Sequence, residues 1–102
     1  MSLEEIRRLV RRRQYRFSFH AEQQREADHI TLDEFEQTIT SPEAELIEGY
    51  LNDPRGPSYL ILGFTRNKHP IHVVCGGHEG LLIIITIYRP NPQEWVDRRK
   101  RR

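Results

Sequence analysis

Apolar residues near the start of the chain recur at helical spacing and then alternate. Residues 3–13 place four apolar side chains on one stripe of a helix whose remaining surface is basic. Residues 15–20 alternate between aromatic and polar side chains, which predicts a strand with an aromatic inner face that includes Phe19. Residues 21–28 favour a helix, and His20 is expected at or beside the N-terminus of that helix.

The start of a further helix carries a clear sequence signature. Thr31 followed three residues later by Glu34 forms a capping box, which predicts a helix from about Leu32 to Ile39. Ser41-Pro42 ends this helix, because proline lacks the N–H group and disfavours a helical conformation in the residue before it.

The second half of the chain is rich in strand patterns. The predicted elements are a strand at 46–50, a turn at 52–57, strands at 59–66 and 71–75, a loop at 75–80 and a strand at 81–88. The last strand is apolar on both faces and therefore belongs inside a sheet. Asn91-Pro92 predicts a C-terminal helix that runs into the basic residues 98–102. The chain is thus expected to be one α+β domain over 1–102, with a basic N-terminal helix within 1–14 and a basic tail at 98–102.

Alternation along these strands predicts two different sheet faces. Ile83, Ile85 and Ile87 form a wholly apolar face, which we expect the helices to cover. The opposite face is mixed, and it presents His72, Thr86 and Tyr88 from the later strands, with Ser18 and His20 from the first. The mixed face is the candidate functional surface.

Charge is divided among three blocks although the formal net charge is only +1. Residues 1–25 and 54–102 are basic, whereas residues 26–53 carry acids and neither Lys nor Arg. We expect folding to bring the basic ends together and to keep the acidic block apart. The longest apolar run, Leu81 to Ile85, is too short to span a membrane. A single cysteine and no apolar N-terminal stretch are most consistent with a reducing cytoplasm.

A metal site is not expected from the regular spacing of His69, His72, Cys75 and His78. Side chains alternate along a strand, so His69 and Cys75 would share one face and His72 the other. Structural zinc sites usually draw their ligands from close pairs on a turn or helix, which this segment lacks. The sequence therefore predicts neither a metal nor a cofactor.

Two histidines and a tyrosine on one face suggest metal-independent RNA cleavage. In that reaction the 2′-hydroxyl attacks its own phosphodiester, so the enzyme supplies a base, an acid and cations. His20 beside a helix N-terminus suits the base, since the helix dipole favours its neutral form. His72 or Tyr88 could be the acid.

Cations are available to hold phosphates in this hypothesis. Arg16, Lys68 and Arg89 are the candidates, and Arg98 to Arg102 would attract a polyanion. These features also have purely structural interpretations. His20 could cap its helix, and His72 could be a strand histidine whose hydrogen bonds are all made within the protein. The tail could complement the dipole of a helix C-terminus. A non-catalytic module that binds protein or nucleic acid is therefore the alternative function.

The ordered motifs of the chain resemble a bacterial family known only as domain of unknown function 4258. The motifs are Phe19-His20-Ala21, Ile30-Thr31, Tyr59 to Gly63, Pro70 to Val74, and Ile85 to Pro92 leading to Trp95. That family is similar to the RelE/ParE superfamily of toxins. The resemblance implies helices packed on one face of a curved antiparallel sheet of four to five strands.

The resemblance also implies a function. It implies a toxin-like ribonuclease that acts on ribosome-bound or free mRNA and is held inactive by a cognate antitoxin, with His20 and His72 at the family's characteristic positions. Gln24 matches a polar position of the family, and we include it with Thr86 among the expected substrate contacts. The chain departs from the family at Asp28-His29, where Arg-Gly is usual. The acidic block could bind the antitoxin or a second copy of the chain.

Overall fold

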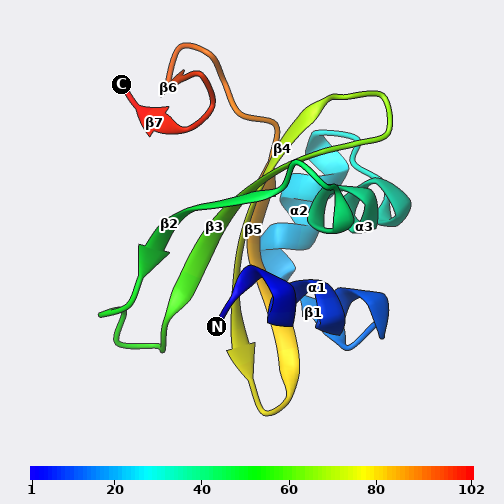
Figure 1. Ribbon diagram of the computed structural model, residues 1–102, viewed down its shortest axis with the longest axis vertical. Helices are drawn as coiled ribbons and strands as arrows, with labels where there is room; N and C mark the ends of the chain where they lie inside the picture. Colours follow the sequence, from blue (N-terminus) through cyan, green and yellow to red (C-terminus); the bar gives the residue numbers. More distant parts are fainter.

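The computed structural model describes residues 1–102 and shows three helices packed against a five-stranded sheet, with a small hairpin at the C-terminus (Figure 1). The elements are α1 (Leu3–Arg11), β1 (Tyr15–Phe17), α2 (Phe19–Ala27), α3 (Leu32–Thr40), β2 (Glu45–Tyr50), β3 (Ser58–Phe64), β4 (Pro70–His78), β5 (Leu81–Tyr88), β6 (Trp95–Val96) and β7 (Lys100–Arg101). The predicted α+β class is confirmed. No helix has the length and apolar character needed to cross a membrane.

Side-chain caps determine where the helices begin. The Thr31 hydroxyl accepts a hydrogen bond from the Glu34 N–H, and the Glu34 carboxylate accepts one from the Thr31 N–H, which confirms the predicted capping box. Ser18 caps α2 in a related way, because its hydroxyl accepts from the Ala21 N–H. This cap places Phe19 in the helix, where it is 80% exposed, so the predicted aromatic strand through Phe19 is wrong beyond Phe17.

The five strands lie in the order β1-β5-β4-β3-β2. Neighbouring strands are antiparallel except β1, which pairs in parallel with β5. The expectation of an antiparallel sheet is therefore wrong at this edge, since α2, α3 and three strands intervene before the chain returns beside β1.

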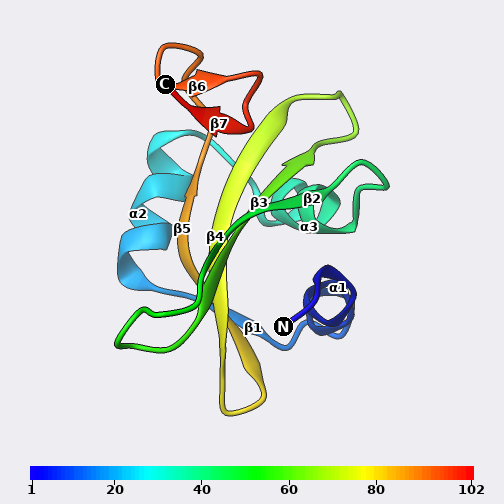
Figure 2. The same ribbon diagram turned by 60° about the vertical axis from the view of Figure 1, so that its left-hand side comes forward.

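The helices cover one face of the sheet and enclose the main core (Figure 2). Ile6 and Val10 of α1, Phe35 and Ile39 of α3 and Ala21 of α2 are buried there. An aromatic group joins the layers, with the ring centroid of Phe35 lying 5.0 Å from that of Tyr15 and 4.9 Å from that of Phe17.

A shift in pairing changes the expected faces of β5. Cys75 pairs with Ile84 and Val74 pairs with Thr86, so Ile85 is an extra residue on β5. Ile84 and Ile87 consequently both lie in the main core. The prediction that the helices would cover Ile83, Ile85 and Ile87 together is wrong, because the irregularity reverses the alternation between Ile84 and Ile87.

The C-terminal segment forms a hairpin, so the predicted C-terminal helix is wrong. Asn91 opens one helical turn, since its carbonyl accepts hydrogen bonds from the N–H groups of Glu94 and Trp95. The chain then turns back through Asp97 and Arg98, whose φ angles of 51° and 63° are incompatible with a right-handed helix. β6 and β7 pair as an antiparallel ribbon beyond the end of the main sheet (Figure 1).

The acidic block and the basic tail lie together. Arg99 Nε is 2.6 Å from Glu45 Oε2, and Arg101 Nη2 is 3.3 Å from Glu48 Oε1. The expected separation of the acidic block from the basic ends is therefore wrong, because the hairpin folds back beside β2.

Candidate functional site

The sheet face away from the helices carries the candidate site. We call it the open face and define it by His72 and Val74 of β4 and by Ile83, Ile85, Thr86 and Tyr88 of β5. His72 pairs with Tyr88 and Val74 with Thr86 across the two strands, as the alternation predicted for this part of the face. The C-terminal hairpin covers one end of the open face. Trp95 packs there edge-on against His72, with ring centroids 4.5 Å apart, and leaves His72 fully buried.

Both ring nitrogens of His72 have hydrogen-bond partners. Nε2 lies 2.7 Å from the carbonyl oxygen of Arg98, and Nδ1 lies 3.1 Å from the Tyr88 hydroxyl. Because a carbonyl can only accept, Nε2 carries the proton and donates it. The neutral ring then accepts at Nδ1, and the Tyr88 hydroxyl donates to it.

Burial keeps both members of this pair uncharged at neutral pH. It lowers the pKa of His72 below its ordinary value of 6.5, although the hydrogen bond to the Arg98 carbonyl acts in the opposite direction. Burial also raises the pKa of Tyr88 to about 12. We call this hydrogen-bonded pair of Tyr88 and His72 the relay; at neutral pH its proton lies on the Tyr88 oxygen.

A cation lies over this cluster. The Arg101 guanidinium carbon is 4.7 Å from the centre of the Trp95 ring, which is a cation–π contact. The same guanidinium donates to the Tyr50 hydroxyl at 3.1 Å and pairs with Glu48. The Tyr50 hydroxyl also donates to Glu48. We call the Arg99–Glu45 and Arg101–Glu48 ion pairs the latch, because they join the hairpin to β2 above His72.

The structure does not bring His20 to His72. His20 lies exposed in the first turn of α2, within the helical layer, and makes no side-chain hydrogen bond or ion pair. Figure 2 shows that α2 begins beside β1 and rises toward the hairpin, so its first turn lies at the end remote from β6 and β7. His20 therefore occupies a position separate from the relay.

The other predicted substrate contacts are divided between the two faces. Arg16 is exposed on β1 in register with Ile83 and has no ion-pair partner, and Thr86 lies on the open face. Gln24 instead accepts a hydrogen bond from the Ile87 N–H at 3.2 Å. Lys68 pairs with Glu43 at 2.6 Å in the turn between β3 and β4. Arg16 and Thr86 are thus the members of this set available to a ligand on the open face.

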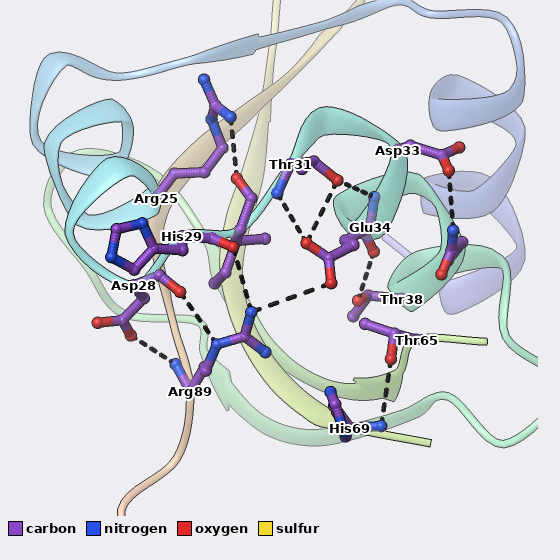
Figure 3. Close-up of polar contacts among 12 residues, drawn as sticks. Arg25, Asp28, His29, Thr31, Asp33, Glu34, Thr38, Thr65, His69 and Arg89 are labelled. Atoms are coloured by element: carbon purple, nitrogen blue, oxygen red, sulfur yellow. Dashed lines mark hydrogen bonds and ion pairs between the residues drawn. The ribbon is translucent and has the colours of Figure 1, made fainter. Parts of the chain in front are cut away.

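Arg89 ties the end of β5 to the loop between α2 and α3 (Figure 3). Its N–H donates to Asp28 Oδ2 at 2.9 Å, its Nε donates to the Asp28 carbonyl at 3.0 Å, and its Nη2 donates to the His29 carbonyl at 3.3 Å. Glu34 lies 4.0 Å from the guanidinium. These bonds give Asp28 and Arg89 a role in joining the layers, and a phosphate at Arg89 would compete with them.

The sequence matches a known protein family. A family model described as "Domain of unknown function (DUF4258)" matches residues 17–89. The chain belongs to this family. The DUF4258 region contains α2, α3, the strands from β2 to β5 and both members of the relay, and it leaves α1 and the C-terminal hairpin outside. Neither the curated proteins nor the solved structures provide a match.

Two residues outside the DUF4258 region and two on β2 complete the candidate site. Trp95 packs against His72, Arg101 lies over the Trp95 ring, and Tyr50 and Glu48 of β2 hold Arg101. Trp95, Tyr50 and Glu48 were not predicted as site residues, and Arg101 was predicted only as part of the basic tail that would attract a polyanion. Their sequence signal is the charge opposition between the tail, which holds four arginines and one lysine, and the acidic segment around Glu48.

The regularly spaced histidines and cysteine do not converge in this DUF4258 chain. Cys75 lies in the core under the helices, whereas His72 faces the opposite side, as strand alternation predicted. Burial raises the pKa of the Cys75 thiol to about 12, so the thiol stays protonated. No three His, Cys, Asp or Glu side chains come close enough together to hold a metal ion.

Proposed function

We propose that this DUF4258 chain is an endoribonuclease and the toxin component of a type II toxin-antitoxin pair. The observation that carries the proposal is the neutral Tyr88–His72 relay on the open face, with Arg101 beside it. The resemblance of the family to the RelE/ParE superfamily of toxins, which the sequence motifs imply, supports the same function. Messenger RNA is the proposed substrate, and an antitoxin is the proposed partner.

The relay acts first as a base. The ribose 2′-hydroxyl gives its proton to the Tyr88 oxygen while the Tyr88 proton moves to His72 Nδ1. The 2′-oxygen then attacks the adjacent phosphorus. His72 becomes an imidazolium whose Nε2–H still donates to the Arg98 carbonyl, so the charged ring keeps both hydrogen bonds.

The relay then acts as an acid, which agrees with the role expected for His72 or Tyr88. As the bond from phosphorus to the 5′-oxygen breaks, the proton returns from Nδ1 through Tyr88 to that oxygen. The products are a 2′,3′-cyclic phosphate and a 5′-hydroxyl. The proton lost by the 2′-hydroxyl thus ends on the leaving group, and the enzyme returns to its neutral state.

Cations at the edges of the open face stabilise the negative charge of the transition state. Arg101 supplies positive charge next to the relay, and its guanidinium is already oriented by Glu48 and Tyr50. Arg98 and Lys100 are exposed and have no ion-pair partner, so they remain available to RNA phosphates.

The test uses single-stranded RNA and the same oligonucleotide with 2′-deoxyribose at every position. We expect the RNA to be cut into fragments that end in 2′,3′-cyclic phosphates, and the deoxy oligonucleotide to stay intact because it lacks the nucleophile. Since His20 lies away from the relay, His20→Ala should cleave RNA within a few-fold of the wild-type rate. RNA left intact by the wild-type protein would refute the proposal.

The toxin role has its own test. Expression of the wild-type chain should arrest bacterial growth, and co-expression of a small protein encoded next to it should relieve the arrest. Cultures that grow normally while the protein accumulates in folded form would exclude a toxin.

A non-catalytic RNA-binding module is the second candidate. The observation that favours it is that His72 is fully buried with both ring nitrogens bonded, as in a structural histidine. This candidate predicts that the wild-type protein binds RNA without cutting it.

A further inference from the structure

A hollow lies on the open face, at the end away from the C-terminal hairpin. Its volume is about 230 Å³, and it is enclosed by the loop between β2 and β3, the end of β4 and the strand β5. The residues that matter for its chemistry are Arg55 of the loop, Gly76 and His78 of β4, and Ile83 and Ile85 of β5. The volume is below the roughly 300–1,000 Å³ typical of sites for drug-sized ligands, so the hollow suits one small ring system.

The floor of the hollow is formed by apolar side chains of β5. The irregularity between β4 and β5 turns Ile85 toward the open face beside Ile83. Gly76 faces Ile83 across the strands and contributes no side chain. A Cβ atom on Gly76 would lie 2.7 Å from the Pro57 carbonyl oxygen, so glycine is what allows the loop to approach the sheet here.

Arg55 presents a fixed planar group at the edge of the hollow. Its Nε and Nη2 donate to the two carboxylate oxygens of Asp53, each at 3.3 Å, and its N–H donates to Asp53 Oδ1 at 2.9 Å. The side chain is nevertheless 84% exposed, so the surface of the guanidinium is free. A guanidinium oriented by a carboxylate and open to solvent is a platform on which an aromatic ring can stack.

A further cation and an imidazole lie near the apolar floor. Arg16 is in register with Ile83 on the neighbouring strand and has no ion-pair partner. His78 is 72% exposed where β4 ends. An apolar floor, a planar cation and a neighbouring unpaired arginine match the parts of a nucleotide: a base to stack and a phosphate to bind.

We propose that this hollow binds one unpaired base of an RNA strand, with the base lying between Arg55 and the floor formed by Ile83 and Ile85. The inference rests on the proposed function and identifies where the substrate is held. Ile85 and Tyr88 are three residues apart on one strand, roughly 10 Å. The base therefore belongs to a nucleotide close to the phosphate that is cleaved.

The test measures binding separately from cleavage. A short single-stranded RNA with 2′-O-methyl groups throughout cannot be cut, and a series of such oligonucleotides carries one abasic site at each position in turn. We expect the loss of one particular base to weaken binding to the wild-type protein by about tenfold or more, since stacking of a single base carries that much affinity.

Arg55→Ala should remove this position dependence, and Arg66→Ala is the matched control. Arg66 is a similarly exposed arginine in the turn after β3 and lies outside the hollow, so its loss changes the net charge equally. Both variants should melt within a few degrees of the wild-type protein. The base-binding proposal would be overturned if the two substitutions changed RNA binding equally, or if all abasic sites weakened binding equally.

The two proposals fail in different ways. Cleavage of unmodified RNA without any dominant abasic position would refute the base-binding hollow and leave the ribonuclease proposal standing. A dominant abasic position that depends on Arg55, in a protein that does not cut RNA, would support the hollow and refute the ribonuclease.

Discussion

His72 combines complete burial with two hydrogen bonds of fixed direction. The Arg98 carbonyl can only accept, so the ring presents its lone pair to Tyr88 and to no other group. Tyr88, whose pKa is raised to about 12, remains the donor in that bond throughout the physiological pH range. These two residues were predictable from strand alternation, because neighbouring antiparallel strands place residues in register on one face. The enclosure of His72 was not predictable in this way, since Trp95 reaches it from a segment that the sequence pattern assigned to a helix.

The lowered pKa of His72 makes stability depend on pH. The unfolded chain binds a proton near pH 6.5, whereas the folded chain does so only at lower pH, so the contribution of His72 is present above about pH 6.5 and is lost as pH falls below it. The free energy of unfolding in urea should therefore fall between about pH 7 and pH 5 by at most about 1.4 kcal/mol per pH unit from this group. His72→Gln should show a smaller decline, and His78→Ala should decline like the wild-type protein. Equal declines in the wild-type protein and His72→Gln would contradict the buried neutral histidine.

The C-terminal hairpin is the element whose structure depends most on distant contacts. Asn91-Pro92 has the sequence of a helix start, and one helical turn does form there. The chain then leaves the helical conformation, because Trp95 packs on His72 and the arginines of the tail pair with β2. Local patterns predicted most helices and strands, since caps and turns are encoded nearby. They did not predict the parallel pairing of β1 or the extra residue on β5, which depend on strands far apart in the sequence.

The latch can be tested by exchanging its charges. Arg101→Glu and Glu48→Arg should each loosen the hairpin, and the double variant should partly restore it, because the ion pair is then re-formed in reverse. Trp95 is the only tryptophan and is buried, so its fluorescence reports the state of the hairpin. Each single variant should shift the emission to longer wavelength and make it easier to quench with iodide.

Lys100→Glu is the control for this experiment. It makes the same change of charge on the neighbouring residue, which is exposed and has no ion-pair partner. Its emission should match that of the wild-type protein. An unchanged emission in Arg101→Glu would show that the latch does not hold Trp95 in place.

The whole molecule has two unlike faces of one sheet. The helical face encloses the main aliphatic core, and the open face carries the relay at one end and the base-sized hollow at the other. The near-zero net charge of the chain conceals this organisation. The acidic segment and the basic tail meet at the latch, while Arg16, Arg98 and Lys100 keep their charges unpaired. Charge blocks were visible in the sequence, but which charges cancel depends on the path of the folded chain.

The most direct test of the relay is the single-turnover rate of RNA cleavage by Tyr88→Phe compared with the wild-type protein. The substitution removes only the hydroxyl that bonds to His72 Nδ1, so the aromatic packing with His72 remains. We predict that the cleavage rate falls by about 10²-fold or more, while the affinity for uncleavable 2′-O-methyl RNA changes by less than about twofold. Cleavage by Tyr88→Phe at the wild-type rate would contradict the relay.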